Sequence, residues 1–263
     1  YKRQQYSGGP AADGNVPTSG LNAYFDANSD SGAPFTVTVN ATANCLDMDW
    51  SAVDQTPTLA GSSALNIYGS STLASGMTIT YTGDITYRAT SSTKTITSSG
   101  NVLLSNFILN GSGGTFQLVD QLAIGGAKGF TNTAGTFDAN TQTVLFSGTA
   151  HTITPTTAIT FYNLTRTPSS AAKTDSLTLA GNVTVANTLT ISNGATTSNR
   201  VIVQSNTKGT ARTITCNGTV SASNADFQDI TGAGSASWDL SAISGGSGNA
   251  GGNTGITFTT ADD

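Results

Sequence analysis

The chain has 263 residues and a mass of 26.5 kDa, which lies within the size range of one all-β domain. Only 10% of the residues are charged and none is glutamate, while Thr, Ser, Asn and 30 Gly dominate, a composition of strands and turns that argues against a helical protein. The net charge of −5 argues against a surface that tracks phosphates, so no nucleic-acid partner is expected.

Residues 1–34 are rich in Gly, Pro, Ser and Asn and show little periodicity, which predicts an irregular N-terminal cap or lead-in. No apolar run approaches the ~18 residues needed to cross a membrane, so no membrane insertion is expected.

From Phe35 the sequence alternates between apolar and polar residues, the pattern of a half-buried strand. The apolar positions are odd up to Cys45 and even from Leu46 to Trp50. A change of phase without an intervening turn predicts a corner, at which the strand bends while its inward side stays inward.

This unit of short strand and Gly, Asn or Ser corner recurs up to residue 231, at a spacing of roughly twenty to twenty-five residues that is typical of solenoids. We therefore predict an all-β fold, a right-handed parallel β-helix (β-solenoid) of about eight to nine coils over residues 35–231, with irregular caps at both ends. The alternative is a β-sandwich, but its hairpins favour Asn-Gly turns, of which the chain has too few. Thr and Asn at outward positions would form ladders between coils.

The inward ladder is predicted to contain apolar residues from every coil. These are Ile67, Ile79, Ile85, Leu109, Leu118, Ile124, Phe137, Val144, Phe146, Ile159, Phe161, Leu177, Leu179, Val183, Val185, Leu189, Ile191, Val201, Val203, Ile214 and Phe227.

The repeat of short alternating strands stops in residues 232–263. The sequence there predicts a Gly-rich loop at 245–255 followed by one last strand, Gly255 to Thr260. This segment is interpreted as a C-terminal cap or an assembly strand.

The sequence offers little catalytic chemistry. The single histidine, His151, has no nucleophile motif around it and is predicted to be a solvated loop residue. Asp47 and Asp49 share an outward face and could approach a glycosidase spacing of ~5–9 Å, but outward polar residues are expected in any case. Asp226 and Asp229 are interpreted as turn residues.

No metal or cofactor is expected. One histidine and two distant cysteines cannot form a four-ligand zinc site. The segment Asp26 to Gly32 is similar to an acidic calcium loop, but its glycine comes one place late and the bidentate glutamate is missing. The Gly-rich segments 111–114 and 244–248 lack the Lys-Ser/Thr of a phosphate loop.

Two aromatic and two thiol side chains complete the candidates. Trp50 is in phase with the apolar positions before it and is predicted to pack in the core, whereas Trp238 could be packed or exposed. Cys45 and Cys216 are predicted to be unpaired thiols that face the core, because about seven coils would separate them, far beyond the ~7 Å reach of a disulfide.

Four segments of the sequence are distinctive. They are NVPTSGLNAYFDANS, FTVTVNATANCLDMDW, PTLAGSSALNIYGSSTLASGMTITYTG and ADFQDITGAGSASWDLSAISGGSGNAGGNTGITFTTADD. Over most of residues 15–263, the chain resembles β-solenoid modules of uncharacterised structural proteins, tail-fibre or adhesin-like, of bacteriophages and environmental viruses. It departs from them by lacking an opening Trp-Gly-Gly strand, and by having Asn249 and Ala250 where they often carry a cysteine.

The resemblance implies a virion or cell-surface structural role and transfers no catalytic residues. We expect a non-enzymatic structural protein, extracellular or in a virion, whose rigid rod assembles with itself or with other virion or surface proteins. The alternative is a carbohydrate-binding or depolymerising β-helix, such as a phage receptor-binding protein or adhesin that contacts a surface glycan.

Assembly is predicted to run head to tail. The last strand would add to the first coil of another copy around Phe35, Val37 and Val39, and Ile256 and Phe258 would fill pockets there. A contact of this kind propagates into a filament unless it closes a ring.

Overall fold

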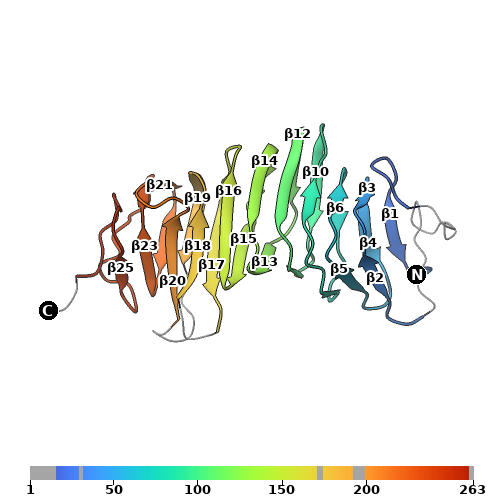
Figure 1. The fold of residues 1–263 in the computed structure, drawn as a ribbon, viewed down its shortest axis with the longest axis horizontal. Coiled ribbons are helices and arrows are strands. Elements are labelled where there is room, and N and C mark those ends of the chain that lie inside the picture. Colours follow the sequence, from blue (N-terminus) through green and yellow to red (C-terminus); the bar gives the residue numbers. More distant parts are fainter. Residues whose placement is uncertain (1–15, 30–31, 171–173, 192–198, 261–263) are drawn as a thin grey trace. The chain divides into compact units, whose positions relative to one another are not determined.

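A computed structural model describes residues 16–29, 32–170, 174–191 and 199–260 (Figure 1). Every regular element in these residues is a β-strand. All strand pairs whose register the described residues define run parallel, and they stack in about ten turns. The chain is therefore a parallel β-solenoid, as predicted, and not a sandwich of hairpins. None of the described segments forms a helix that could span a membrane.

The contacts divide the chain into two compact units. The first comprises Tyr1–Ile124 and Asn132–Asn140, and the second comprises Gly125–Thr131 and Thr141–Asp263.

The first unit contains the strands β1 to β12, and β13 and β14 contribute residues to both units. Their bounds are β1 (Ala23–Asp26), β2 (Thr36–Val39), β3 (Ala43–Cys45), β4 (Met48–Ala52), β5 (Thr58–Gly61), β6 (Leu65–Ile67), β7 (Ser71–Thr72), β8 (Thr78–Ile79), β9 (Ile85–Tyr87), β10 (Thr93–Thr97), β11 (Val102–Leu103), β12 (Phe107–Leu118), β13 (Leu122–Gly126) and β14 (Phe130–Asp138).

The register of the first unit builds columns of inward side chains. Ala23 pairs with Met48, Met48 with Ser71, Ser71 with Ile96, and Ile96 with Leu118, at separations of 22 to 25 positions. All five residues are buried. The three faces of each early coil follow the orders β1-β4-β7-β10, β2-β5-β8 and β3-β6-β9, so three short strands enclose one interior.

The second unit contains the remaining strands. Their bounds are β15 (Thr143–Gly148), β16 (Ala150–Pro155), β17 (Thr160–Pro168), β18 (Thr174–Leu179), β19 (Val183–Ile191), β20 (Arg200–Ser205), β21 (Arg212–Cys216), β22 (Thr219–Ala222), β23 (Ala225–Gln228), β24 (Ile230–Ala233) and β25 (Ser247–Asn249).

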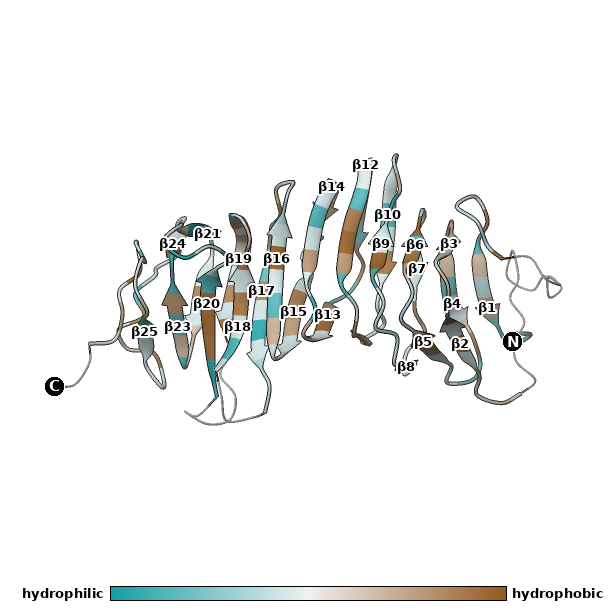
Figure 2. Cartoon of the chain, in the orientation of Figure 1, coloured by the Kyte–Doolittle hydropathy of each residue, from teal (hydrophilic) through white to brown (hydrophobic). Residues whose placement is uncertain are grey.

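The second unit is built in the same way. His151 pairs with Leu177, Leu177 with Val203, Val203 with Phe227, and Phe227 with Asn249, at separations of 22 to 26 positions. Figure 2 shows the resulting apolar bands, for example on β20. Of the residues predicted to form the inward ladder, all are buried except Ile79, which is half-buried.

Outward ladders also form as expected. Thr36, Thr58 and Thr78 stand in one register on neighbouring strands. Asn187 Nδ2 donates to Asn163 Oδ1 at 2.8 Å, one coil away. Uncharged polar side chains stack in this way without the repulsion that like charges would suffer.

Two boundaries of the sequence interpretation are wrong. The lead-in 1–34 contains β1, and the Gly-rich loop 245–255 contains β25, so the solenoid extends beyond residues 35–231 on both sides. The sequence did not predict β25 because Ser, Gly and Asn, which form residues 247–249, have low strand propensity. They adopt the strand because β23 offers a parallel ladder to pair with.

Candidate functional site

The first coil of the first unit consists of β1, β2 and β3, and among the described residues each has a strand neighbour on one side only. In a parallel sheet, the backbone groups of successive residues point to opposite neighbours. Phe35 O accepts from Thr58 N, so the N–H and C=O of Thr38 point away from β5. This edge could accept a further strand.

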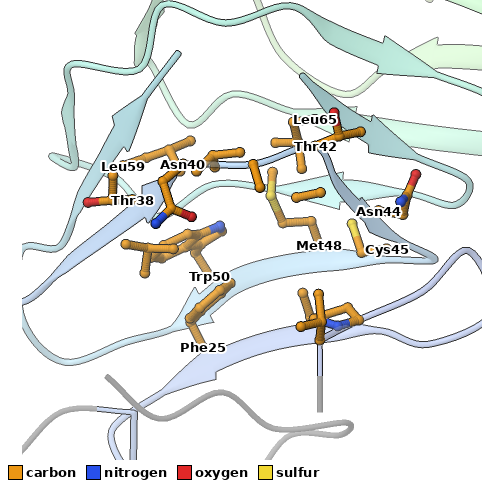
Figure 3. A pocket seen from close by; sticks show the side chains of 17 residues that line it. Phe25, Thr38, Asn40, Thr42, Asn44, Cys45, Met48, Trp50, Leu59 and Leu65 are labelled. Carbon is orange, nitrogen blue, oxygen red and sulfur yellow. The ribbon is translucent and has the colours of Figure 1, made fainter. Parts of the chain in front are cut away.

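A cavity of about 360 Å³ lies inside this coil (Figure 3). None of the described residues that line it carries a charge. They are Val16, Pro17, Ala23, Phe25, Val37, Thr38, Val39, Asn40, Ala41, Thr42, Ala43, Asn44, Cys45, Met48, Trp50, Leu59 and Leu65. Ligand sites are commonly concave, mostly apolar and of this volume.

The predicted assembly residues on β2 and just before it gather here. Val37 and Val39 are buried and line the cavity. Phe35 is half-buried, and its ring lies 6.1 Å from that of Trp50 at an interplanar angle of 15°. The alternation of the sequence placed these side chains inward, but it gave no sign that the coil around them is incompletely filled.

Trp50 is a fully buried core residue, as predicted. Its ring stacks on Phe25 with centroids 3.8 Å apart and planes at 16°. The indole Nε1, however, donates to no acceptor in the described chain, an arrangement that costs about 1–3 kcal/mol when the donor is buried. Figure 3 shows this nitrogen on the side of the ring nearer Met48, among the lining side chains. The other indole, of Trp238, donates to Ala233 O at 3.0 Å.

Both cysteines are free and buried, which confirms the prediction. Cys45 lines the cavity, and its Sγ lies 4.0 Å from Asn66 O. Burial, with a smaller contribution from Asp47, raises the pKa of the Cys45 thiol to about 12. The thiol is therefore protonated at neutral pH and unsuited to nucleophilic chemistry.

The predicted assembly residues at the C-terminal end pack against their own chain. Phe258 lies with its ring centroid 6.0 Å from that of Phe227. Ile256 lies beside Gly232 and Trp238: a Cβ on Gly232 would be 2.6 Å from the indole ring and 3.0 Å from the Ile256 side chain. Gly232 is therefore required for close packing at this end.

The backbone ties the same segment down, so the prediction of a detached strand from Gly255 to Thr260 is wrong. Thr257 N donates to Trp238 O at 3.0 Å, and Leu240 N donates to Thr257 O at 2.8 Å. Single bridges at Thr254 and Thr257 replace a strand. The segment alternates because Ile256 and Phe258 cover the last coil. Its backbone nevertheless forms only isolated bridges and no continuous ladder with another strand.

His151 is not a solvated loop residue. It lies on β16, is 1% exposed, and pairs in an inward column with Leu177 of β18. Its Nδ1 lies 2.6 Å from Lys128 O, so Nδ1 carries the proton, and the buried Nε2 has no partner in the described chain. Burial lowers the pKa of His151 to about 4, against the opposing effect of the Lys128 hydrogen bond.

Sequence reasoning missed Arg166, which is fully buried between Phe146 and Ile191 in an inward column. Its guanidinium donates to backbone carbonyls, including Gly148 O at 2.9 Å. Burial lowers the pKa of Arg166 to about 10, and the charge of the buried Asp175 opposes this. The phase of Arg166 with Leu164 was the signal that could have revealed it.

The carboxylate pair Asp47 and Asp49 is half-buried and engaged with backbone. Asp47 Oδ1 accepts from Ser70 N at 2.7 Å, and Asp49 Oδ1 accepts from Ser51 N at 2.8 Å. Asp47 thus binds a corner of the next coil, whereas Asp49 binds a backbone N–H within its own strand, β4.

Asp226 and Asp229 differ from each other. Asp226 lies within β23 and forms a bidentate ion pair with Arg200 one coil away, at 2.6 and 2.8 Å, so its interpretation as a turn residue is wrong. Asp229 is a turn residue with φ of 54°, and its Oδ2 accepts from Gly209 N.

The segment that is similar to a calcium loop, which begins at Asp26, forms hydrogen bonds between its own side chains and backbone. Asp26 Oδ1 accepts from Asn28 N at 2.8 Å, and Asp26 N donates to Ser29 Oγ at 3.0 Å. Asp30 lies outside the described residues. Across the part of the chain that the structure describes, no three His, Cys or acidic side chains cluster as metal ligands would.

The fold and these sites define a parallel β-solenoid with an apolar cavity in its first coil. Comparisons with family models, with curated proteins and with solved structures returned no match.

Proposed function

We propose that this chain is a non-enzymatic structural protein of a virion or an extracellular filament, which assembles with itself or with a partner through its first coil. Stacked coils with continuous backbone ladders resist bending and proteolysis, and the low charge of the outward face fits a passive surface.

The difference between the two ends carries this proposal. The last coil of the second unit is covered by Trp238, Ile256 and Phe258 of the same chain. The first coil of the first unit presents strand edges, with Thr38 backbone groups directed away from β5. Natural proteins cover such edges or use them for association.

The placement of the histidine, arginine and aspartate side chains that could serve in catalysis also supports a structural role. His151 and Arg166 are buried in inward columns, and Asp47 and Asp49 accept hydrogen bonds from backbone N–H groups. These groups contribute to the fold where an enzyme would expose them to substrate.

The test is Thr38→Pro, with Thr38→Ser as the matched control. Proline removes an N–H that points away from β5, so the β2–β5 ladder is kept while a strand can no longer pair fully at this edge. We expect light scattering and electron microscopy to show assemblies for the native chain and Thr38→Ser, and smaller particles for Thr38→Pro. A native chain that stays monomeric at high concentration, or assembly unchanged by proline in a folded variant, would contradict the proposal.

A further inference from the structure

We propose that the first-coil cavity is a binding site for an uncharged, apolar small molecule with one hydrogen-bond acceptor, of about the size of a fused two-ring aromatic ketone. The acceptor would take the hydrogen bond that Trp50 Nε1 offers. The site lies in the same coil as the assembly edge proposed above, but ligand binding needs no second copy.

The volume sets the size of the ligand. A cavity of about 150 Å³ lined by aliphatic and aromatic side chains binds benzene. The first-coil cavity measures about 360 Å³, so it has room for two fused rings with a short substituent.

The lining sets the polarity of the ligand. Ala23, Val37, Val39 and Leu59 present apolar groups, and no described lining residue could neutralise a charge. An ionised ligand would lose its hydration without compensation, whereas a neutral one gains by leaving water.

Trp50 sets the position of the acceptor. Its side chain is fully buried, and its Nε1 is a donor without an acceptor in the described chain. Stacking on Phe25 at 3.8 Å holds the ring, so the N–H is oriented before a ligand arrives. A carbonyl oxygen suits this donor, because it accepts in the plane of its substituents and carries no charge.

The test uses two probes of nearly equal shape, 2-acetylnaphthalene and 2-ethylnaphthalene, of which only the first has an acceptor. Binding is measured by equilibrium dialysis, together with the indole N–H signals of the full chain labelled with ¹⁵N-tryptophan. We expect the ketone to bind about tenfold more tightly than the hydrocarbon. We also expect it to shift the Trp50 signal downfield and leave that of Trp238 in place.

Two variants locate the site. Trp50→Phe keeps an aromatic ring but removes the N–H, so the two probes should bind equally. Ala43→Leu adds a larger side chain to the lining without deleting a packed group, so the fold should persist while both probes bind more weakly.

The proposal is overturned if the native chain binds neither probe, or if both bind equally well. It also fails if the folded Ala43→Leu variant binds them as the native chain does. A chain whose first coil is already occupied by its own N-terminal residues or by another copy would give the first of these results.

Discussion

Two ionisable side chains of the second unit, His151 and Arg166, stand in columns of aliphatic and aromatic residues. The N–H groups of each side chain donate hydrogen bonds to backbone carbonyl oxygens. The histidine donates from Nδ1 to Lys128 O, and the guanidinium donates to carbonyls including Thr149 O at 3.1 Å. The donors of a buried polar group can thus be satisfied by backbone carbonyls at the corners of the solenoid, and Arg166 also has the charge of the buried Asp175 nearby.

The buried histidine predicts a pH dependence of stability. The folded-state pKa of His151 is about 4, below its ordinary value of 6.5, so between these values the unfolded chain binds a proton that the folded chain does not. The free energy of unfolding should be unaffected by this group well above pH 6.5 and fall as the pH drops to about 4, by roughly 3 kcal/mol. Arg166 and Asp175 are the charged groups that act on the ring.

The measurement is urea unfolding at pH 7 and at pH 4.5 for the native chain and for His151→Leu. The variant has nothing to titrate at this position, so its stability should change less between the two pH values. An equal change in both proteins would show that other groups cause the acid sensitivity.

At the scale of elements, the two terminal coils solve the same problem differently. A coil inside a solenoid has a neighbour on each side, and a terminal coil lacks one. The last coil is covered by a segment that donates from Thr257 N and packs Phe258 on Phe227. This cover is possible because Gly232 leaves room for the ring of Trp238.

Truncating this cover is predicted to reduce stability and to leave association unchanged. Phe258→Ala and Ile256→Ala each remove half-buried apolar surface, at a cost of about 1–2 kcal/mol. Thr260→Ala, at an exposed position, is the control and should cost little. Thermal unfolding measures the first effect and light scattering the second. If the alanine variants lose association but keep their stability, Ile256 and Phe258 contact another copy, as the sequence first indicated.

At the scale of the whole molecule, the parallel coils explain the composition. Strand residues of neighbouring coils stand in register with one another, at separations of 18 to 31 positions. Uncharged Thr and Asn tolerate such stacking, whereas like charges in neighbouring coils would repel one another. This explains why the outward face carries few charges. Several of the carboxylates that remain accept hydrogen bonds from backbone N–H groups, as Asp47 does from Ser70 and Asp120 does from Ser98 and Ser99.

The double variant Asp47→Asn/Asp49→Asn therefore tests the non-enzymatic proposal. Asparagine keeps an Oδ1 acceptor for both backbone contacts, so stability should change by less than about 1 kcal/mol. We expect neither the native chain nor the variant to release reducing ends or unsaturated sugars from a panel of polysaccharides. Release by the native chain that is lost in the variant would favour a depolymerising β-helix.

The alternation of apolar and polar residues was sufficient to predict the all-β class, the solenoid repeat and nearly the whole inward ladder, because it reflects which side of its own strand each residue faces. It also placed Trp50 and both cysteines in the core. The alternation also puts His151 in phase with the buried Ile153, but a histidine within a polar run is more often solvated, so its burial was not predicted.

By itself, the sequence determined the direction of each side chain, because period-2 alternation is a local property of an extended backbone. Only the tertiary structure decided what each side chain meets, since its neighbours come from strands a full coil away in sequence. This is why the cavity beside Trp50, the carbonyls around Arg166 and the packing of Phe258 on Phe227 could not be predicted. The same reason applies most strongly at the terminal coils, where the repeat supplies no neighbour and the chain must close the end with irregular segments.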